Sequence, residues 1–216
     1  MVEYQQKNRY NIDDLLDIMR LLRSEGGCPW DREQTHESIK SDFIEETCEV
    51  IEAIDLKDTA LLREELGDVL LQVVFHCRIE EEAENFRFDD VCDEVCKKLI
   101  VRHPHVFGDT AAATSAEVLA NWDKIKAKTK GQTGADTVKD VPRALPALMR
   151  AQKLAKRAAK AGLYTKSEEF SGLSEDEAKR ELGRRLFELS GAAESAGISA
   201  EEALSEENDR FLSNIQ

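Results

Sequence analysis

The chain has 216 residues, of which 41% are hydrophobic and 34% charged, and its formal net charge is -14. It can therefore fill a core, while its acidic surface argues against a nucleic acid polymer bound through its phosphate backbone. No stretch has the roughly 20 apolar residues of a membrane span, and the first residues form no apolar signal core. We expect a cytoplasmic protein without a membrane partner.

The beginning of the sequence predicts two helices joined by an ordered loop. Apolar residues at the helical period predict a helix over residues 12–22, with Asn11 as its cap. The segment Cys28–His36, CPWDREQTH, contains a proline and reads as an ordered loop. A second helix is expected from about residue 37 to 54, capped by Thr35.

The pattern continues with a third helix over residues 62–84 and a fourth over residues 89–101. Val91, Val95 and Leu99 are expected on the inward face of the fourth helix, and a shorter helix is expected over residues 115–128. No alternating strand pattern occurs. The predicted fold class is therefore all-α, a four-helix bundle.

The second half of the chain contains a degenerate repeat of the first half. Residues 129–144 are polar and read as a linker. Beyond them, in residues 145–216, Met149-Arg150 echoes Met19-Arg20, and Glu181-Leu182-Gly183 echoes Glu65-Leu66-Gly67. The second copy has Arg184 where the first has Asp68, and nothing in it matches Glu45, Glu46 and Glu49. We therefore expect no active site there.

Acidic side chains lie beside the apolar stripes of the second and third helices. Residues three or four apart share a helix face, so Glu46 and Glu49 are neighbours on one helix, and Glu65 and Asp68 on the next. A short turn favours antiparallel packing, which would bring the two pairs to a common point. Ionised acids so close repel one another, and a hard divalent cation would relieve this repulsion. Oxygen-only ligation suits Mg²⁺, with Mn²⁺ as a substitute.

Other interpretations of these residues stay open. The acids could be solvated faces of ordinary amphipathic helices. A di-iron centre is disfavoured because a Glu-x-x-His on each of two helices is missing. Cys92 and Cys96 with the following histidines match no common zinc module.

Three further residues are candidates for binding a substrate. Lys98 and Arg102 lie four residues apart on the fourth helix, where their cationic ends could reach a phosphate. Trp30, in the loop before the second helix, offers an aromatic face on which a base could stack. Each of these residues also has a purely structural interpretation. The two cations could stabilise the C-terminus of their helix, and Trp30 could cover an edge of the core.

The blocks CPWDREQTHESI, FIEETCEVIEAI, REELGDVLLQVVFH and KLIVRHPHVFGD, followed by NWDKIK, together resemble the MazG family of nucleoside triphosphate pyrophosphohydrolases. The resemblance runs from about Leu15 to Lys126. It implies an all-α bundle, usually dimeric, that binds Mg²⁺ and cleaves nucleoside triphosphates to monophosphate and pyrophosphate in house-cleaning of nucleotide pools. By the same resemblance, residues 1–128 would be the MazG-type domain and residues 145–216 a degenerate MazG-like repeat.

The resemblance also implies roles for individual residues. Its E-E-x-x-E and E-x-x-D signature falls on acids of the second and third helices: Glu45, Glu46, Glu49, Glu65 and Asp68. The last four would hold the metal, and Glu45 would be an auxiliary ligand or a base that orients water. Lys98 and Arg102 would steady the departing pyrophosphate.

Two alternatives accompany this interpretation. The protein could be a non-catalytic or weakly active helical interaction module whose acids are surface residues. Within the enzyme class, relatives of this bundle hydrolyse dUTP or phosphoribosyl-ATP, although the CPWDREQTH loop favours the MazG branch.

Overall fold

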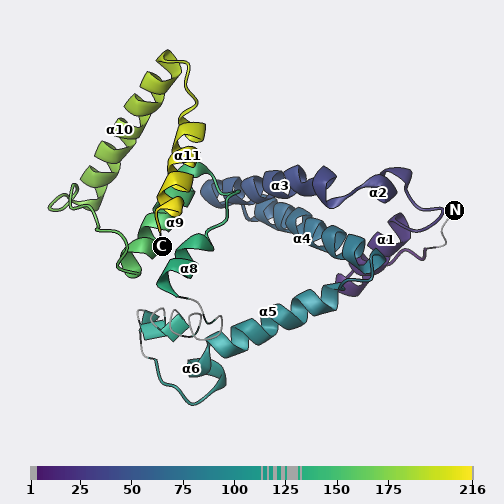
Figure 1. The fold of residues 1–216 in the computed structure, drawn as a ribbon. Coiled ribbons are helices and arrows are strands. Elements are labelled where there is room, and N and C mark those ends of the chain that lie inside the picture. The colour runs from purple at the N-terminus through teal and green to yellow at the C-terminus, as the bar shows by residue number, and fades with distance from the viewer. Residues whose placement is uncertain are drawn as a thin grey trace. The chain divides into compact units, whose positions relative to one another are not determined.

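The structure is a computed structural model, and it is helical without strands throughout the residues that it describes. These residues are 4–112, 114, 115, 117, 118, 121, 122, 125, 131 and 133–215. The all-α fold class is thus confirmed for the described part. The chain divides into two compact units, Met1–Asp109 and Thr110–Gln216, which are coloured purple to teal and green to yellow in Figure 1.

The first unit is built around one long helical hairpin. Its helices are α1 (Ile12–Leu22), α2 (Pro29–Glu33), α3 (His36–Leu56), α4 (Thr59–Glu82), α5 (Phe88–Arg102) and α6 (Pro104–Phe107). Helices α3 and α4 lie side by side, and α1 packs against α4 near the end at which α3 begins (Figure 1). The four long helices predicted from apolar periodicity are all present, while the segment expected as a loop contains the short helix α2.

The predicted caps are confirmed at both helices where they were expected. The Asn11 side chain accepts a hydrogen bond from the backbone N–H of Asp14, and the Thr35 side chain accepts one from Ser38. Each cap satisfies one of the backbone donors that a helix start leaves unpaired. The starts of α1 and α3 are thus fixed by local sequence.

The core of the first unit lies where α1, α3 and α4 meet. Met19, Ile39, Val74 and Phe75 are almost fully buried there. Phe88, at the start of α5, packs against this cluster. Farther along, α5 leaves α4 (Figure 1), and no residue of α5 is buried.

The inward face expected for the fourth helix is only partly covered in this chain, because Val91 is half-buried while the two later residues are exposed. Val95 is 39% exposed and Leu99 is 47% exposed. Apolar periodicity does not give the angle at which α5 leaves α4.

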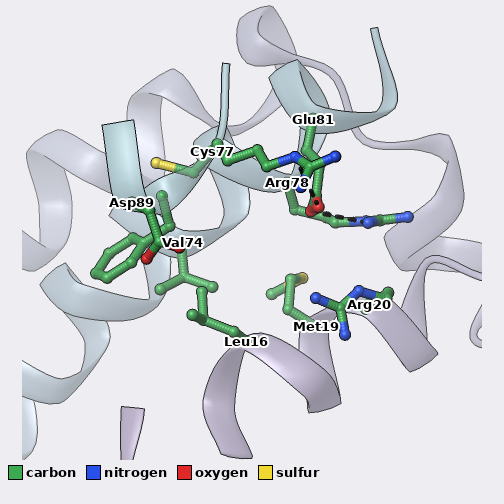
Figure 2. A pocket seen from close by; sticks show the side chains of 10 residues that line it. Leu16, Met19, Arg20, Val74, Cys77, Arg78, Glu81 and Asp89 are labelled. Carbon is green, nitrogen blue, oxygen red and sulfur yellow. Dashed lines mark hydrogen bonds and ion pairs between the residues drawn. The ribbon is translucent and has the colours of Figure 1, made fainter. Parts of the chain in front are cut away.

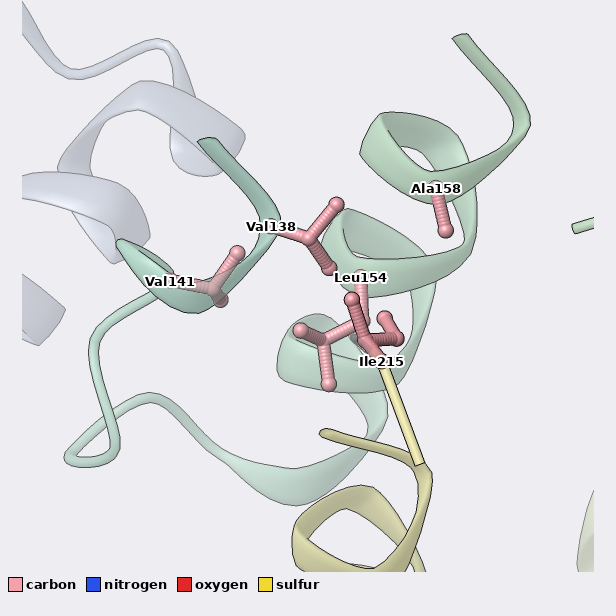
Figure 3. Close-up of a cluster of buried hydrophobic side chains, with 5 residues drawn as sticks. All are labelled: Val138, Val141, Leu154, Ala158 and Ile215. Carbon is pink, nitrogen blue, oxygen red and sulfur yellow. The ribbon is translucent and has the colours of Figure 1, made fainter. Parts of the chain in front are cut away.

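The second unit has its own helices and its own core. The helices are α8 (Gly134–Lys139), α9 (Ala147–Lys160), α10 (Glu175–Ser195) and α11 (Ala200–Ser213). Figure 3 shows the buried cluster that joins α8, α9 and the end of the chain: Val138, Val141, Leu154, Ala158 and Ile215. Two of these residues, Val138 and Val141, lie in the segment expected as a linker, residues 129–144.

The helix expected over residues 115–128 lies largely outside the described residues. None of the helices in the described part combines the length and the apolar character that a membrane crossing requires.

Candidate functional site

The two helices that carry the predicted site are joined by a turn of two residues. Helix α3 ends at Leu56, and the next residue, Lys57, caps it in a left-handed conformation with φ of 56°. The next residue, Asp58, caps α4, and its carboxylate accepts hydrogen bonds from the backbone N–H groups of Ala60 and Leu61. So short a turn makes α3 and α4 antiparallel neighbours, as the sequence predicts.

The hairpin brings three of the predicted acids together. One carboxylate oxygen from each of Glu46, Glu49 and Glu65 lies within 4.8 Å of the others. Glu65 is buried, and the two glutamates of α3 are half-buried. Among the described residues, this is the one group of three or more acidic, histidine or cysteine side chains with such spacing.

The electrostatics of this acid cluster (Glu46, Glu49, Glu65) reflect its crowding. Burial raises the pKa of Glu65, and a hydrogen bond with Glu49 and the charges of Glu49 and Asp68 raise it further. Burial also raises the pKa of Glu46, followed by the charges of Asp68, Glu49 and Glu45. Without a cation, the surroundings of Glu46 and Glu65 therefore disfavour the charged forms of these two carboxyl groups relative to water.

Asp68 and Glu45 lie at the edge of the cluster. Asp68 is outside the group of three, but its charge acts on both Glu46 and Glu65, which places it beside them. Glu45 is exposed and acts on Glu46 more weakly than Asp68 does. Three acids of the signature thus converge, Asp68 is close enough for its charge to act on two of them, and Glu45 is exposed.

The donor set fits a hard divalent cation. Mg²⁺ binds oxygen ligands at about 2.1 Å, so two of its ligands lie at most about 4.2 Å apart. Carboxylate oxygens already within 4.8 Å of one another need to approach only slightly. The residues that would hold the ion are Glu46, Glu49 and Glu65, with Asp68 adjacent.

The structure does not bring Lys98 and Arg102 to the acid cluster within this chain. Both lie on the part of α5 that has left α4 (Figure 1). The charges that most strongly shift the pKa values of Glu46 and Glu65 are all acidic. Helical spacing placed these two cations on one face, but it carries no information about the direction of α5.

Trp30 lies in α2, at the far end of α3 from the hairpin turn (Figure 1). Its side chain is 58% exposed, so it does not cover the core. Glu46 lies ten residues into α3, which is ~15 Å along the helix axis at 1.5 Å per residue. Trp30 and the acid cluster therefore occupy different places on the hairpin.

A buried arginine that sequence reasoning missed holds the segment around Trp30. The Arg23 guanidinium binds Glu82 of α4 through Nη2 at 2.7 Å and also donates to the carbonyls of Asp31 and Gln34. It lies 5.3 Å from the centre of the Phe75 ring. One arginine thereby ties α2 to α4, and because Arg23 and Glu82 are far apart in sequence, no local pattern indicates this contact.

Beyond Asp68, the polar stripe of α4 continues into a histidine pair. Nδ1 of His36 lies 2.7 Å from Nδ1 of His76, and the two rings stack with centroids 4.9 Å apart. Nε2 of His36 lies 2.6 Å from a carboxylate oxygen of Glu80. Burial lowers the pKa of His76, and the charge of His36 lowers it further. This chain of contacts fixes both rings.

A separate pocket lies between α1, α4 and the start of α5 (Figure 2). Arginines line it, and each has a carboxylate partner: Arg20 pairs with Asp17, Arg78 with Glu81 at 2.9 Å, and Arg87 with Glu81 at 3.8 Å. Because these charges neutralise one another, we interpret the pocket as part of the packing between the helices.

Comparison with known proteins identifies the same region. A family model described as the MazG nucleotide pyrophosphohydrolase domain matches residues 34–107, which include the acid cluster and all of α3, α4 and α5. A solved structure described as a MazG-related protein from Thermotoga maritima is 27% identical, with a TM-score of 0.46, over 53% of this chain and 98% of that one.

The curated relatives match over both units. A nucleoside triphosphate pyrophosphohydrolase of Escherichia coli (strain K12) is 43% identical, over 93% of this chain and 84% of its own length. A nucleoside triphosphate pyrophosphohydrolase/pyrophosphatase MazG of Thermotoga maritima is 39% identical, over 95% of this chain and 84% of its own length. This identity and coverage, together with the family match, show that the chain belongs to the MazG family.

Proposed function

We propose that the protein is a metal-dependent nucleoside triphosphate pyrophosphohydrolase that converts NTPs and dNTPs to monophosphates and pyrophosphate. Such an activity would clear nucleotides from the cytoplasmic pool. The observation that carries the proposal is the convergence of Glu46, Glu49 and Glu65 from two antiparallel helices, with oxygens within 4.8 Å of one another. The names of the relatives from E. coli and T. maritima support the same activity.

In this proposal the carboxylates of α3 and α4 hold Mg²⁺, with Mn²⁺ as a substitute. The bound cation would neutralise phosphate oxygens and lower the pKa of the attacking water. Glu46, Glu49, Glu65 and Asp68 contribute negative charge in a partly desolvated place, which selects a divalent cation over a monovalent one. In this proposal Glu45, which is exposed, would accept a proton from the water that attacks the α-phosphorus.

We further propose that the protein acts as a homodimer. Large apolar side chains on the first unit are between 39% and 64% exposed: Ile44, Ile51, Leu66, Leu70, Val95 and Leu99. A second copy would cover part of this surface. Within one chain, Lys98, Arg102 and Trp30 lie away from the acid cluster. In the proposed dimer, these residues would contact a substrate bound at the acid cluster of the second copy. Light scattering after size-exclusion chromatography tests this, and a monomer at micromolar concentration would contradict it.

In the second unit we propose a degenerate MazG-like repeat without catalysis of its own. Glu181 of α10 is bound by Arg184 at 2.7 Å and by Arg185 at 2.7 Å. Its carboxylate is therefore neutralised by arginines of this chain.

Chromatography of nucleotides incubated with the protein and Mg²⁺ tests the proposed reaction. We expect monophosphate and pyrophosphate in equal amounts and no diphosphate. The double variant Glu49→Gln, Asp68→Asn should abolish the release of pyrophosphate. A matched control, Glu64→Gln with Asp55→Asn, removes the same charges from exposed positions of the same helices and should retain it. Release that survives in the first variant would contradict the site and favour an interaction module.

A further inference from the structure

Helix α10 is a long helix that buries none of its residues within this chain. It spans 21 residues, and all of them are exposed or half-buried. It lies closest to α11 near the turn that joins the two helices, and it diverges from α11 toward its own start (Figure 1). Helices in proteins are stabilised mainly by packing an apolar face, so a helix of this length without a buried residue indicates a contact outside the chain.

Phe187, near the middle of α10, marks the face that is left uncovered. Its side chain is 81% exposed, more than any other large hydrophobic side chain of the described part. The half-buried apolar residues of α10 are Ala178, Leu186 and Ala193. They lie ~100° or more around the helix from Phe187, at 3.6 residues per turn. The face of Phe187 is therefore turned away from the contacts that α10 makes within its own unit.

Two glycines flank Phe187 on this face. Gly183 lies four residues before Phe187 and Gly191 four residues after it, so each is one helical turn away. A glycine inside a helix is destabilising relative to alanine. Neither position requires one, because both have ordinary helical backbone and open space where a Cβ would stand. Contacts among the described residues do not account for these glycines, whereas a second helix packed closely on this face would.

The two ends of this face carry charges of opposite sign. Arg180 lies seven residues before Phe187, and Glu194 lies seven residues after it, so both share its face. Both are exposed, and neither forms an ion pair with a described residue. In an antiparallel pair of α10 helices centred on Phe187, each Arg180 lies opposite Glu194 of the other copy. The face is thus complementary to itself, as a twofold contact between identical chains requires.

We propose that α10 binds α10 of a second copy of this chain in antiparallel orientation, with the two Phe187 rings packed together at the twofold axis. In this register Gly183 lies opposite Gly191 of the other copy, and the two backbones can approach closely. Two ion pairs between Arg180 and Glu194 fix the register at its ends. The surface belongs to the second unit, so the inference depends neither on the proposed reaction nor on the apolar surface of the first unit.

Photo-cross-linking of the full chain tests the contact directly. The photoreactive residue p-benzoylphenylalanine replaces Phe187 in one sample and Leu148, an exposed residue of α9, in a control sample. After irradiation without nucleotide, we expect the Phe187 position to give covalent dimers in which mass spectrometry finds the cross-link on α10 of the other copy. The Leu148 position should give no dimer linked through α10. Absence of dimers from the Phe187 position, cross-links outside α10, or equal yields on α10 from both positions would overturn the inference.

Charge reversal tests the register. With the cross-linker at position 187, Arg180→Glu and Glu194→Arg each place like charges opposite one another twice in the dimer. Each should lower the yield about fivefold or more. The double variant restores opposite charges and should recover the yield. Glu175→Arg, on an exposed residue ~120° around the helix, is the matched control and should change nothing. A double variant no better than the single variants would overturn the inference.

Gly191→Ala separates the contact from the stability of the helix itself. Alanine favours a helix, so the melting temperature at a dilution without dimers should stay the same or rise. The added methyl groups at the contact should nevertheless lower the yield of cross-linked dimers. An unchanged yield would overturn the inference. A protein that cross-links through α10 but releases no pyrophosphate would support this contact and contradict the proposed function, and the opposite pair of results would do the reverse.

Discussion

Glu65 in the first unit and Glu181 in the second occupy the same Glu-Leu-Gly sequence but have opposite electrostatic surroundings. Around Glu65, burial, a hydrogen bond with Glu49 and neighbouring acids raise the pKa of the carboxyl group. Around Glu181, hydrogen bonds from Arg184 and Arg185 lower the pKa from its ordinary value of 4.5 to about 2. Three residues after the shared glutamate, the first unit has Asp68 and the second has Arg184.

If the acid cluster binds a cation as proposed, the residue three positions after the shared glutamate distinguishes a cation site from an ion pair with arginine. A glutamate surrounded by acids gains from a bound cation, whereas a glutamate held by two arginines has its charge already balanced. If the second unit is a degenerate repeat as proposed, it keeps the helix and its glutamate but lacks the acidic surroundings that would favour a metal. Four predictions test this comparison.

The largest effect is expected when the first unit receives the residue of the second. In Asp68→Arg, the guanidinium should lower the pKa of Glu65 and raise the melting temperature without metal. Pyrophosphate release should fall about a thousandfold, because several kcal/mol of charge stabilisation are lost at 1.36 kcal/mol per tenfold. The reverse change in the second unit, Arg184→Asp, should leave the rate unchanged. Activity of Asp68→Arg within tenfold of the unaltered protein would refute the comparison.

Leu154→Ala should weaken the second unit without touching the acid cluster. Leu154 is 1% exposed in the core of that unit, so its truncation should cost about 2–5 kcal/mol in the free energy of unfolding. Leu148→Ala, at an exposed position of the same helix, is the control. Chemical denaturation measures the cost, and calorimetric titration with Mg²⁺ should give unchanged binding. Loss of Mg²⁺ binding would show that the two units are not independent in this respect.

Asp58→Ala should loosen the turn that joins the two acid-bearing helices. The Asp58 carboxylate caps α4 through two backbone N–H groups, and loss of such a cap costs about 1 kcal/mol. Asp58→Asn keeps an oxygen acceptor and should cost less. The free energy of unfolding checks both variants, and equal stability of Asp58→Ala and the unaltered protein would show that the turn is held by other contacts.

The smallest effect concerns pH and the second unit. Because the pKa of Glu181 is lowered in the folded state, its ion pairs stabilise the fold above pH 4.5, and this contribution is lost as the pH falls toward about 2. The pairs are near the surface, so salt should screen the effect. Thermal unfolding of Glu181→Gln should show a weaker dependence on pH in this window. Identical pH profiles of Glu181→Gln and the unaltered protein would contradict the assigned pairs.

The parts of the site that sequence predicted are those governed by local rules. The caps at Asn11 and Thr35 and the convergence of Glu46 with Glu65 follow from spacing along a helix and from a two-residue turn. These features depend on residues close in sequence. Local patterns could therefore indicate them.

Other features depend on contacts between residues far apart in sequence. The direction in which α5 leaves α4 separates Lys98 from the acid cluster, and it does not follow from the apolar pattern of α5. The contact of Arg23 with Glu82 joins residues 59 positions apart. Periodicity gives the face of a helix but not its partner.

Titration calorimetry with Mg²⁺ or Mn²⁺ on the unaltered protein and on Glu65→Gln tests the central claim most directly. If the carboxylates of α3 and α4 hold a divalent cation, the unaltered protein should show saturable binding and Glu65→Gln should bind about tenfold more weakly or not at all. Equal affinity in the two proteins, or no binding by the unaltered protein, would contradict the account.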